Sequence, residues 1–198
     1  MTRRPNHPPA AREPDSASDA ASDADIMSRL ARGDSGALGE LYDRYHQRVR
    51  RFVARATSDA EDVDDLVHLT FLAAAGSAGR YDGRLSCRPW LIGIAAQLVR
   101  RRRRAVARLF AVLSSATGVR ARNVDPGAML QARSDVERAL LRISAPKRIA
   151  FLMAEAEGLT CPEIAAALRI PIGTVWTRLH AARRELRRML QEGEGSEP

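Results

Sequence analysis

The stretch of this sequence that decides its fold is EGLTCPEIAAALRIPIGTVWTRLH, residues 157–180. Within it, Thr160 and Glu163 have the spacing of a capping box, in which two side chains satisfy free backbone amides at the start of a helix. Pro171 marks a tight turn after this short helix. Apolar residues then return at helical spacing, at Val175, Leu179, Ala182, Leu186 and Leu190. A short capped helix, a turn and a longer basic helix predict a helix-turn-helix.

The longer helix carries polar and basic side chains on its outer face: Thr174, Trp176, Thr177, Arg178, His180, Arg183, Arg184, Arg187 and Arg188. Six arginines and one glutamate give residues 169–190 a net charge of +5. Threonine and arginine side chains can contact bases in the major groove, and the later arginines suit backbone phosphates. These features favour DNA binding over a solvated helical hairpin. For Trp176, stacking on DNA and covering the domain remain equal alternatives.

The rest of the chain also shows helical periodicity, and no strand-like alternation occurs. One apolar face comprises Leu38, Leu41, Tyr42, Tyr45, Val49 and Phe52. A second pattern runs from Val63 to Ala74, and Ser58 and Glu61 have capping-box spacing before it. A third begins near Pro89 and runs into five consecutive arginines, residues 100–104. The predicted fold is all-α, with two small helical domains joined by a flexible linker.

Composition places the domain boundaries. Residues 1–24 are rich in Pro, Ala, Ser and Asp without apolar periodicity, which predicts a disordered tail. Residues 25–113 form the first predicted domain, and residues 114–135, with several glycine, proline and small polar residues, form the linker. The helix-turn-helix domain spans residues 136–190, and an acidic tail follows at residues 191–198.

Charge and cysteine content restrict the partners and the compartment. The chain has 198 residues, and 32 basic against 24 acidic side chains give a net charge of +8. A folded protein this basic usually binds a polyanion. Cys87 and Cys161 lack metal-ligand spacing, which predicts a reduced cytoplasmic protein without a zinc site or disulfide scaffold. The longest apolar stretch, residues 90–99, is shorter than the roughly 20 residues of a membrane helix, and no signal peptide is expected.

No catalytic site is expected in this chain. Without strands it has no strand–loop–helix phosphate site. The histidines have no mutual spacing that suits a metal; they are His7, His46, His68 and His180. The carboxylates between residues 61 and 65 have no partner base. We therefore predict a non-enzymatic protein with no cofactor, no metal and no small-molecule substrate.

Two blocks of the sequence resemble one protein family in order and spacing. The first comprises GD at 33–34, LYDRY at 41–45, DDLVHLTFL at 64–72 and WLIGIA at 90–95; the second is the stretch 157–180. They resemble regions two and four of bacterial RNA polymerase sigma factors, of the small two-domain extracytoplasmic-function (ECF) type. The family usually has a Gln-Glu pair where His68 and Leu69 stand, and basic residues where Trp176 and Ala181 stand.

The resemblance implies a polymerase-binding surface in the first domain. The helix that holds Asp64 and Asp65 would dock on the β′ subunit of core RNA polymerase, with His68 on the same surface. The acidic block at residues 61–65 of a basic protein also suits a basic protein partner, although acids in a first turn stabilise a helix by themselves. Phe71 is expected in the core rather than at this interface.

The resemblance also implies two promoter contacts. The residues expected at the minus-ten element are Tyr81, Arg84, Ser86, Arg88, Arg100, Arg101 and Arg104. The residues expected at the minus-thirty-five element are Thr174, Trp176, Thr177, Arg178, His180, Arg183 and Arg184. The net charge of +9 over residues 81–122 favours phosphate contacts over a solvated helix end, and Trp90 is expected in the core.

The implied partners are the β′ and β subunits of core RNA polymerase, promoter DNA and an anti-sigma factor, often membrane-bound. The anti-sigma factor would contact residues 41–52, 62–72 and 136–190 and leave the tail before residue 25 free. Two alternatives belong to other classes of protein. One is a DNA-binding regulator that does not join core polymerase, and the other is a scaffold or inhibitor-binding module.

Overall fold

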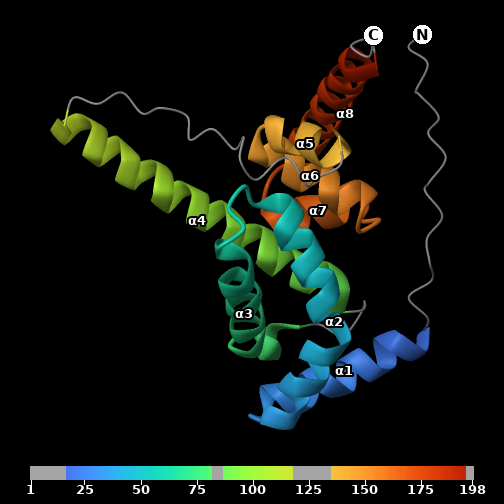
Figure 1. The fold of residues 1–198 in the computed structure, drawn as a ribbon. Helices are drawn as coiled ribbons and strands as arrows, with labels where there is room; N and C mark the ends of the chain where they lie inside the picture. The colour runs from blue at the N-terminus through green and yellow to red at the C-terminus, as the bar shows by residue number, and fades with distance from the viewer. Residues whose placement is uncertain (1–16, 82–86, 118–134, 195–198) are drawn as a thin grey trace.

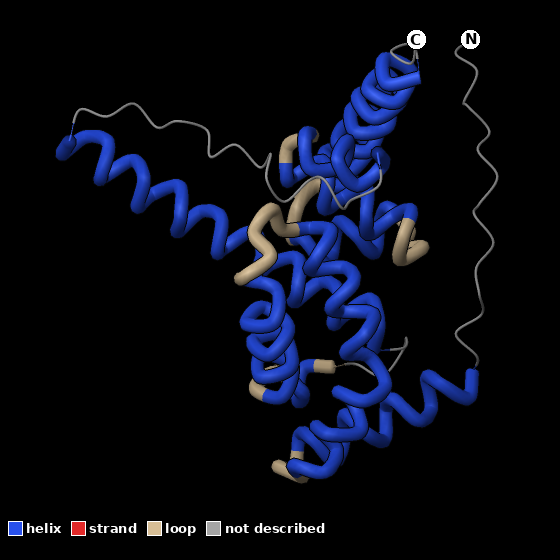
Figure 2. The backbone as a smooth tube through the Cα atoms, in the orientation of Figure 1, coloured by secondary structure: helices blue, strands red, loops and turns tan. Residues whose placement is uncertain are grey.

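The computed structural model describes residues 17–81, 87–117 and 135–194. This part of the chain contains helices and connecting loops but no strand (Figure 2). In chain order the elements are α1 (Ala17–Ala31), α2 (Ser35–Ala56), α3 (Asp62–Ala75), a short 3-10 helix η1 (Ala78–Arg80), α4 (Cys87–Thr117), α5 (Asp135–Arg142), α6 (Ala145–Glu155), α7 (Cys161–Leu168) and α8 (Ile172–Glu194). The all-α prediction is confirmed.

The amino-terminal part is a bundle of α1 to α4. The buried face of α2 is the predicted one, with Leu41, Val49 and Phe52 almost fully buried. Leu66 of α3 and Leu91 of α4 pack into the same core. In Figure 1, α1 crosses the end of α2, while the carboxy-terminal half of α4 projects away from the bundle. Residues 101–109 of α4 are exposed, in agreement with their content of arginine.

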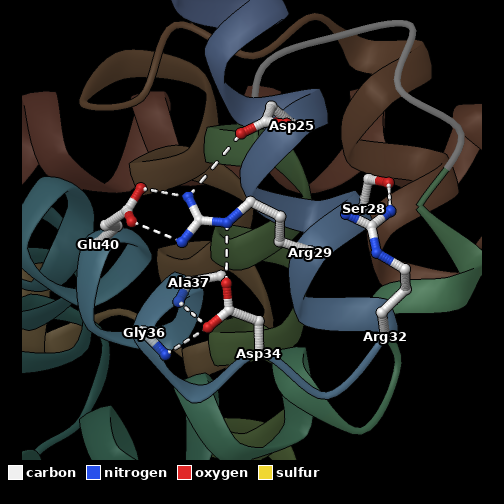
Figure 3. Close-up of polar contacts among 8 residues, drawn as sticks. All are labelled: Asp25, Ser28, Arg29, Arg32, Asp34, Gly36, Ala37 and Glu40. Atoms are coloured by element: carbon white, nitrogen blue, oxygen red, sulfur yellow. Dashed lines mark hydrogen bonds and ion pairs between the residues drawn. The ribbon is translucent and has the colours of Figure 1, made fainter.

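The turn between α1 and α2 is fixed by a network of charged side chains (Figure 3). Asp34 caps α2 by accepting hydrogen bonds from the amides of Gly36, at 2.8 Å, and Ala37, at 3.4 Å. Arg29 donates to Asp34 at 2.8 Å and to both carboxylate oxygens of Glu40 at 2.8 and 3.0 Å. These bonds lower the pKa values of both carboxyl groups below their ordinary range. The network therefore sets where α2 begins.

The carboxy-terminal part contains the predicted helix-turn-helix in α7 and α8. The amide of Thr160 donates to the Glu163 carboxylate at 2.7 Å, and the Glu163 amide donates to the Thr160 hydroxyl at 3.4 Å. The predicted capping box is therefore present. The turn between α7 and α8 is tight, as predicted at Pro171: Arg169 takes a left-handed conformation, with φ of 54°, and α8 begins at Ile172.

The two parts lie in direct contact, and their buried apolar side chains form one continuous core. Gly93 of α4 faces Ala167 of α7 so closely that a Cβ atom at residue 93 would lie 3.0 Å from the Ala167 Cβ. Beside it, Gln97 donates to the Ala167 carbonyl at 2.8 Å and Arg100 donates to the Leu168 carbonyl at 3.0 Å. These bonds satisfy carbonyls at the end of α7 that have no partner within the helix.

Arg148 of α6 makes the second link between the two parts. Its side chain is only 1% exposed. It donates to the Ala56 carbonyl and the Ser58 hydroxyl of the amino-terminal part, both at 3.1 Å. It also donates to the carbonyls of Leu140 and Leu141 at 3.4 and 3.2 Å. A buried guanidinium is stabilised by such bonds because each replaces a bond to water.

Several predicted boundaries are corrected by the structure. Residues 17–24, assigned to the disordered tail, belong to α1. Asp23 of this segment is fully buried, and its carboxylate accepts hydrogen bonds from α2 and α4. Of the predicted linker, residues 114–117 continue α4 and residue 135 begins α5, while residues 191–194 of the predicted acidic tail continue α8. The rest of the predicted tails and linker, residues 1–16, 118–134 and 195–198, lies outside the described residues.

The capping box predicted at Ser58 and Glu61 is also wrong. Glu61 makes no side-chain cap bond, and Ser58 instead accepts from Arg148. The backbone amides before α3 are satisfied by other side chains. The Asp59 amide donates to the Thr57 hydroxyl at 3.2 Å, and the Glu61 amide donates to the Asp59 carboxylate at 3.1 Å. A contact distant in sequence therefore replaces the local one.

Glu157, just after α6, predicts a measurable pH dependence of stability. It is 6% exposed, its Oε2 atom has no hydrogen-bond partner in the part of the chain that the structure describes, and the Arg48 Nε atom of α2 lies 3.9 Å from Oε2. Burial raises the pKa of this carboxyl above its ordinary value of 4.5, although Arg48 and other arginines oppose the shift. The protonated Glu157 carboxyl therefore makes its full contribution to the free energy of unfolding at pH below about 4.5. This contribution is lost as pH rises through the raised pKa.

Glu157→Gln should accordingly raise the Tm at pH 7 and leave it nearly unchanged at pH 4, because glutamine carries no charge to desolvate. Thermal denaturation followed by circular dichroism at both pH values measures this difference. Glu61→Gln, at an exposed glutamate before α3 that makes no side-chain cap bond within the described residues, is the control for a generic loss of negative charge. A Tm at pH 7 that falls in Glu157→Gln would mean that attraction by Arg48 outweighs burial.

Candidate functional site

The first candidate surface is the outward face of α3. Asp64, Asp65, His68, Leu69 and Leu72 are all exposed on this helix, with Leu69 49% and Leu72 61% exposed. Exposed leucines beside carboxylates form a mixed apolar and acidic strip, which is a common composition for a protein-binding surface. We call these five residues the α3 strip.

The acids around the α3 strip differ in their surroundings. Asp62 is buried and pairs with Arg102 of α4 at 2.7 Å, so it belongs to the fold. Asp64 lies 3.2 Å from Arg50 in an exposed pair, which contributes little to stability. Asp65 makes no hydrogen bond or ion pair within the described residues. Among the predicted polymerase-binding residues, Asp65 therefore carries the charge most available to a partner.

His68 is ordered by aromatic neighbours. Its ring stacks on Tyr42 of α2, with centroids 6.3 Å apart and an interplanar angle of 12°. Tyr42 also contacts Phe71, with centroids 4.8 Å apart. Phe71 is 3% exposed and lies in the core, as predicted. Packing on α2 therefore holds the His68 side chain at the edge of the α3 strip.

The second candidate surface lies around the start of α4. Tyr81 follows η1, and its ring contacts Trp90 with centroids 5.6 Å apart. Both rings are half-buried, so Trp90 packs against the core as expected. Arg88 is half-buried in the first turn of α4. Arg84 and Ser86, two further predicted minus-ten residues, lie outside the described residues.

The arginines of α4 divide into two groups. Arg101 and Arg104 are exposed, as phosphate contacts require. Arg100 is half-buried and bound to the Leu168 carbonyl of α7. Its pKa is lowered first by burial and then by the positive charges of Arg104 and Arg178. Arg100, which is predicted at the minus-ten element, therefore lies close to Arg178, which is predicted at the minus-thirty-five element.

The third candidate surface is the outward face of α8. Exposed side chains follow one another at helical spacing, and they are Trp176, Thr177, His180, Arg183, Arg184, Arg187 and Arg188. Trp176 is 59% exposed, so most of its surface is available to a partner. The Thr177 hydroxyl donates to the Gly173 carbonyl at 2.9 Å. The face is held in place by Val175, Leu179 and Ala182, which are buried beneath it.

Three predicted residues of α8 are less free than sequence alone suggests. Arg183 donates to Glu155 of α6 at 2.6 Å, so part of its charge is already neutralised. Thr174 is half-buried. Arg178 is half-buried too, and its Nη1 atom has no hydrogen-bond partner among the described residues. A buried donor without a partner costs free energy, so contact with an acceptor would stabilise Arg178.

Sequence reasoning missed three functional contacts because they join elements far apart in the chain. Gln97 and Arg100 hold the end of α7, and Asp23 binds the first amide of α4. Only the burial of these polar side chains could have indicated the contacts, and burial depends on the tertiary structure.

The described residues contain no group of His, Cys, Asp and Glu side chains that could hold a metal ion. Cys87 and Cys161 are both free. None of the helices in the described ranges is long and apolar enough to span a membrane.

Comparison with known proteins identifies the family of the chain. The family described as Sigma-70 region 2 matches residues 41–109, and the family described as Sigma-70, region 4 matches residues 133–186. The chain is 31% identical over 172 residues to the ECF RNA polymerase sigma factor SigM of Mycobacterium tuberculosis, with 85% of both chains covered. It is 32% identical over 169 residues to the RNA polymerase sigma factor CarQ of Myxococcus xanthus, covering 84% of this chain and 96% of CarQ.

Solved structures show the same fold. The sigma factor RpoE from Bartonella quintana, in complex with the anti-sigma factor NepR, matches with a TM-score of 0.62 at 23% identity, over 77% of this chain and 96% of that one. CnrH in complex with the cytosolic domain of CnrY matches with a TM-score of 0.61 at 24% identity, over 86% and 98%. With both sigma regions matched in order and relatives covered along most of their length, the chain belongs to the ECF group of sigma-70 RNA polymerase sigma factors.

Proposed function

We propose that this sigma factor binds core RNA polymerase through the α3 strip and directs promoter-specific initiation by contacting two promoter elements. The observation that carries the proposal is the pair of sigma regions, each of which presents an exposed face of suitable chemistry. The chain itself needs no catalytic group for this role, because nucleotide addition belongs to the polymerase. It would act in the cytoplasm on chromosomal promoters.

The polymerase-binding assignment rests on charge and exposure. The Asp65 carboxylate, free of intramolecular bonds within the described residues, would meet a basic surface of the β′ subunit. Leu69 and Leu72 would lose exposed apolar surface on binding, which favours association. His68 would contact the same subunit beside them. Electrostatic attraction would speed the encounter and orient it.

The minus-thirty-five assignment rests on the outward face of α8. The amino-terminal half of a recognition helix meets base edges in the major groove, which would place Thr174, Trp176, Thr177, Arg178 and His180 near bases. Arg183 and Arg184, further along, would contact phosphates. The Nη1 atom of Arg178, which lacks a partner among the described residues, would donate a hydrogen bond to an acceptor on DNA.

The minus-ten assignment rests on the start of α4 and its arginines. Tyr81 and Arg88 would contact unpaired bases and the nearby backbone, together with Arg84 and Ser86. Arg101 and Arg104 would bind phosphates. Arg100 would join them once it releases the Leu168 carbonyl, so DNA contact by Arg100 requires α4 and α7 to separate.

An anti-sigma factor is part of the proposal. The solved relatives RpoE and CnrH are held in complexes with NepR and CnrY respectively. For this chain, we propose an inhibitor that contacts residues 41–52, 62–72 and 136–190. In this family the inhibitor is often a membrane-bound protein. Because residues 17–24 belong to α1, which packs into the bundle, the tail proposed to be dispensable for inhibitor binding is limited to the residues before 17.

Arg184→Ala tests the minus-thirty-five assignment. Loss of one phosphate contact should make the log–log salt dependence of promoter binding by the holoenzyme shallower by about 0.9. Fluorescence anisotropy across a series of salt concentrations measures the slope. Arg142→Ala, which removes an exposed arginine of α5, should leave the slope unchanged. Equal slopes for wild type and Arg184→Ala would remove Arg184 from the DNA contact.

A further inference from the structure

Asp23 of α1 is the most completely buried acidic side chain among the described residues, with no exposed surface. Its Oδ2 atom accepts from the Tyr45 hydroxyl and from the Cys87 amide, each at 2.6 Å. Its Oδ1 atom accepts from Arg44 at 2.8 Å. Burial of a carboxylate is costly unless charge and hydrogen bonds compensate it. Here both oxygens are satisfied, and one partner is an arginine.

The position of Cys87 gives this network a function beyond packing. Cys87 is the first residue of α4, and its amide is one of the free donors at the start of that helix. A negative charge there also interacts favourably with the helix dipole. Asp23 therefore fixes where α4 begins relative to α1 and α2, at the point where the chain enters α4 from residues 82–86.

The two ends of this segment are tied together by side chains. Tyr81 precedes it and packs on Trp90 of α4. Burial and the charge of Asp23 raise the pKa of the Cys87 thiol to about 12, and a hydrogen bond with Tyr81 lowers it. The thiol is therefore protonated at neutral pH. Asp23, Cys87 and Tyr81 form a connected chain of contacts from α1 to the beginning of α4.

We infer that Asp23 is a positioning residue for recognition of the minus-ten element. Its hydrogen bonds hold Tyr81 and Arg88 in the arrangement that contacts opened promoter DNA. This inference rests on the minus-ten assignment in the proposed function. It gives α1 a role in promoter opening, although α1 itself offers the DNA no predicted contact.

Asp23→Asn in the full chain tests the inference, with the holoenzyme assembled on a promoter that the wild-type protein uses. The neutral amide cannot accept all three bonds, since its nitrogen is a donor. Initiation from duplex DNA should fall by about tenfold or more, as expected for a lost bond to a charged group. Initiation from the same promoter with a mismatched, already open minus-ten region should recover to near the wild-type rate, and affinity for core polymerase should be unchanged.

Two further variants make the test decisive. Tyr45→Phe removes one donor to Asp23 and should give a smaller loss with the same dependence on the template. Asp25→Asn, at an exposed acid of the same helix, should match wild type on both templates. Unchanged initiation from duplex DNA, an equal loss on both templates, or a loss of core binding in Asp23→Asn would each overturn the inference. Failure of the wild-type holoenzyme at every promoter would instead reject the proposed function.

Discussion

Core RNA polymerase should bind Asp65→Arg about 100-fold more weakly than wild type. The charge reversal sets like charges across the proposed interface, which costs several kcal/mol, and each 1.4 kcal/mol is about a tenfold change in affinity. Since the Asp65 side chain is exposed and makes no hydrogen bond or ion pair within the described residues, the fold should be unaffected. A titration of labelled sigma factor with core enzyme measures the dissociation constant.

The matched control is Asp43→Arg, which reverses an exposed acid on the outer side of α2. It changes the net charge equally and should alter affinity far less. Circular dichroism should give both variants the Tm of wild type. Equal affinities for Asp65→Arg and Asp43→Arg would remove the α3 strip from the polymerase interface. Absence of binding between wild type and core enzyme would instead favour a DNA-binding regulator that acts without polymerase.

Arg148→Met should lower the free energy of unfolding by about 3 kcal/mol, because buried acceptors left without a donor cost about 1–3 kcal/mol each. Methionine retains much of the aliphatic volume, so the loss reports the hydrogen bonds rather than a cavity. The hydrogen bonds of the Arg148 guanidinium reach both parts of the chain, with acceptors on Ala56, Ser58, Leu140 and Leu141. The expected decrease in Tm is about 6–12 °C for a protein of this length.

Ser58→Ala is the matched partner variant, because it removes one of the interdomain acceptors and leaves the guanidinium in place. Its cost should be about 1 kcal/mol, the usual value for one hydrogen bond. Arg142→Ala, at an exposed residue, should have no measurable effect. If Arg148→Met unfolds at the temperature of wild type, the link between the two parts contributes nothing to stability.

Local sequence signals predicted the helix-turn-helix, and the resemblance to sigma factors implied a polymerase-binding role for Asp64, Asp65 and His68 of the α3 strip. The capping box at Thr160 and Glu163 depends on residues three apart, and the apolar repeat of α8 depends on helical spacing. Such features are formed within one or two turns of the chain, so they survive in the tertiary structure. The exposure of Asp65, Trp176 and Arg184 follows from the same periodicity.

The errors have a different physical origin. Asp23 was assigned to a disordered tail because its segment has no apolar pattern, but its partner Cys87 is 64 residues away. Ser58 was assigned to a cap, but it binds Arg148, 90 residues away. The sequence also gives no sign of the bond between Arg100 and the Leu168 carbonyl of α7, which leaves the DNA contact of Arg100 a prediction. Composition and periodicity describe one segment at a time and cannot predict a bond between two segments.

The central claim is that this protein gives core RNA polymerase the ability to start transcription at specific promoters. The most direct test adds the purified full chain to core polymerase from the same bacterium, with fragmented genomic DNA as the template, and sequences the 5′ ends of the transcripts. The account predicts start sites absent with core enzyme alone, preceded by two shared sequence elements at a constant spacing, and lost with Asp65→Arg. Start sites identical to those of core enzyme alone, beside an active holoenzyme control, would contradict it.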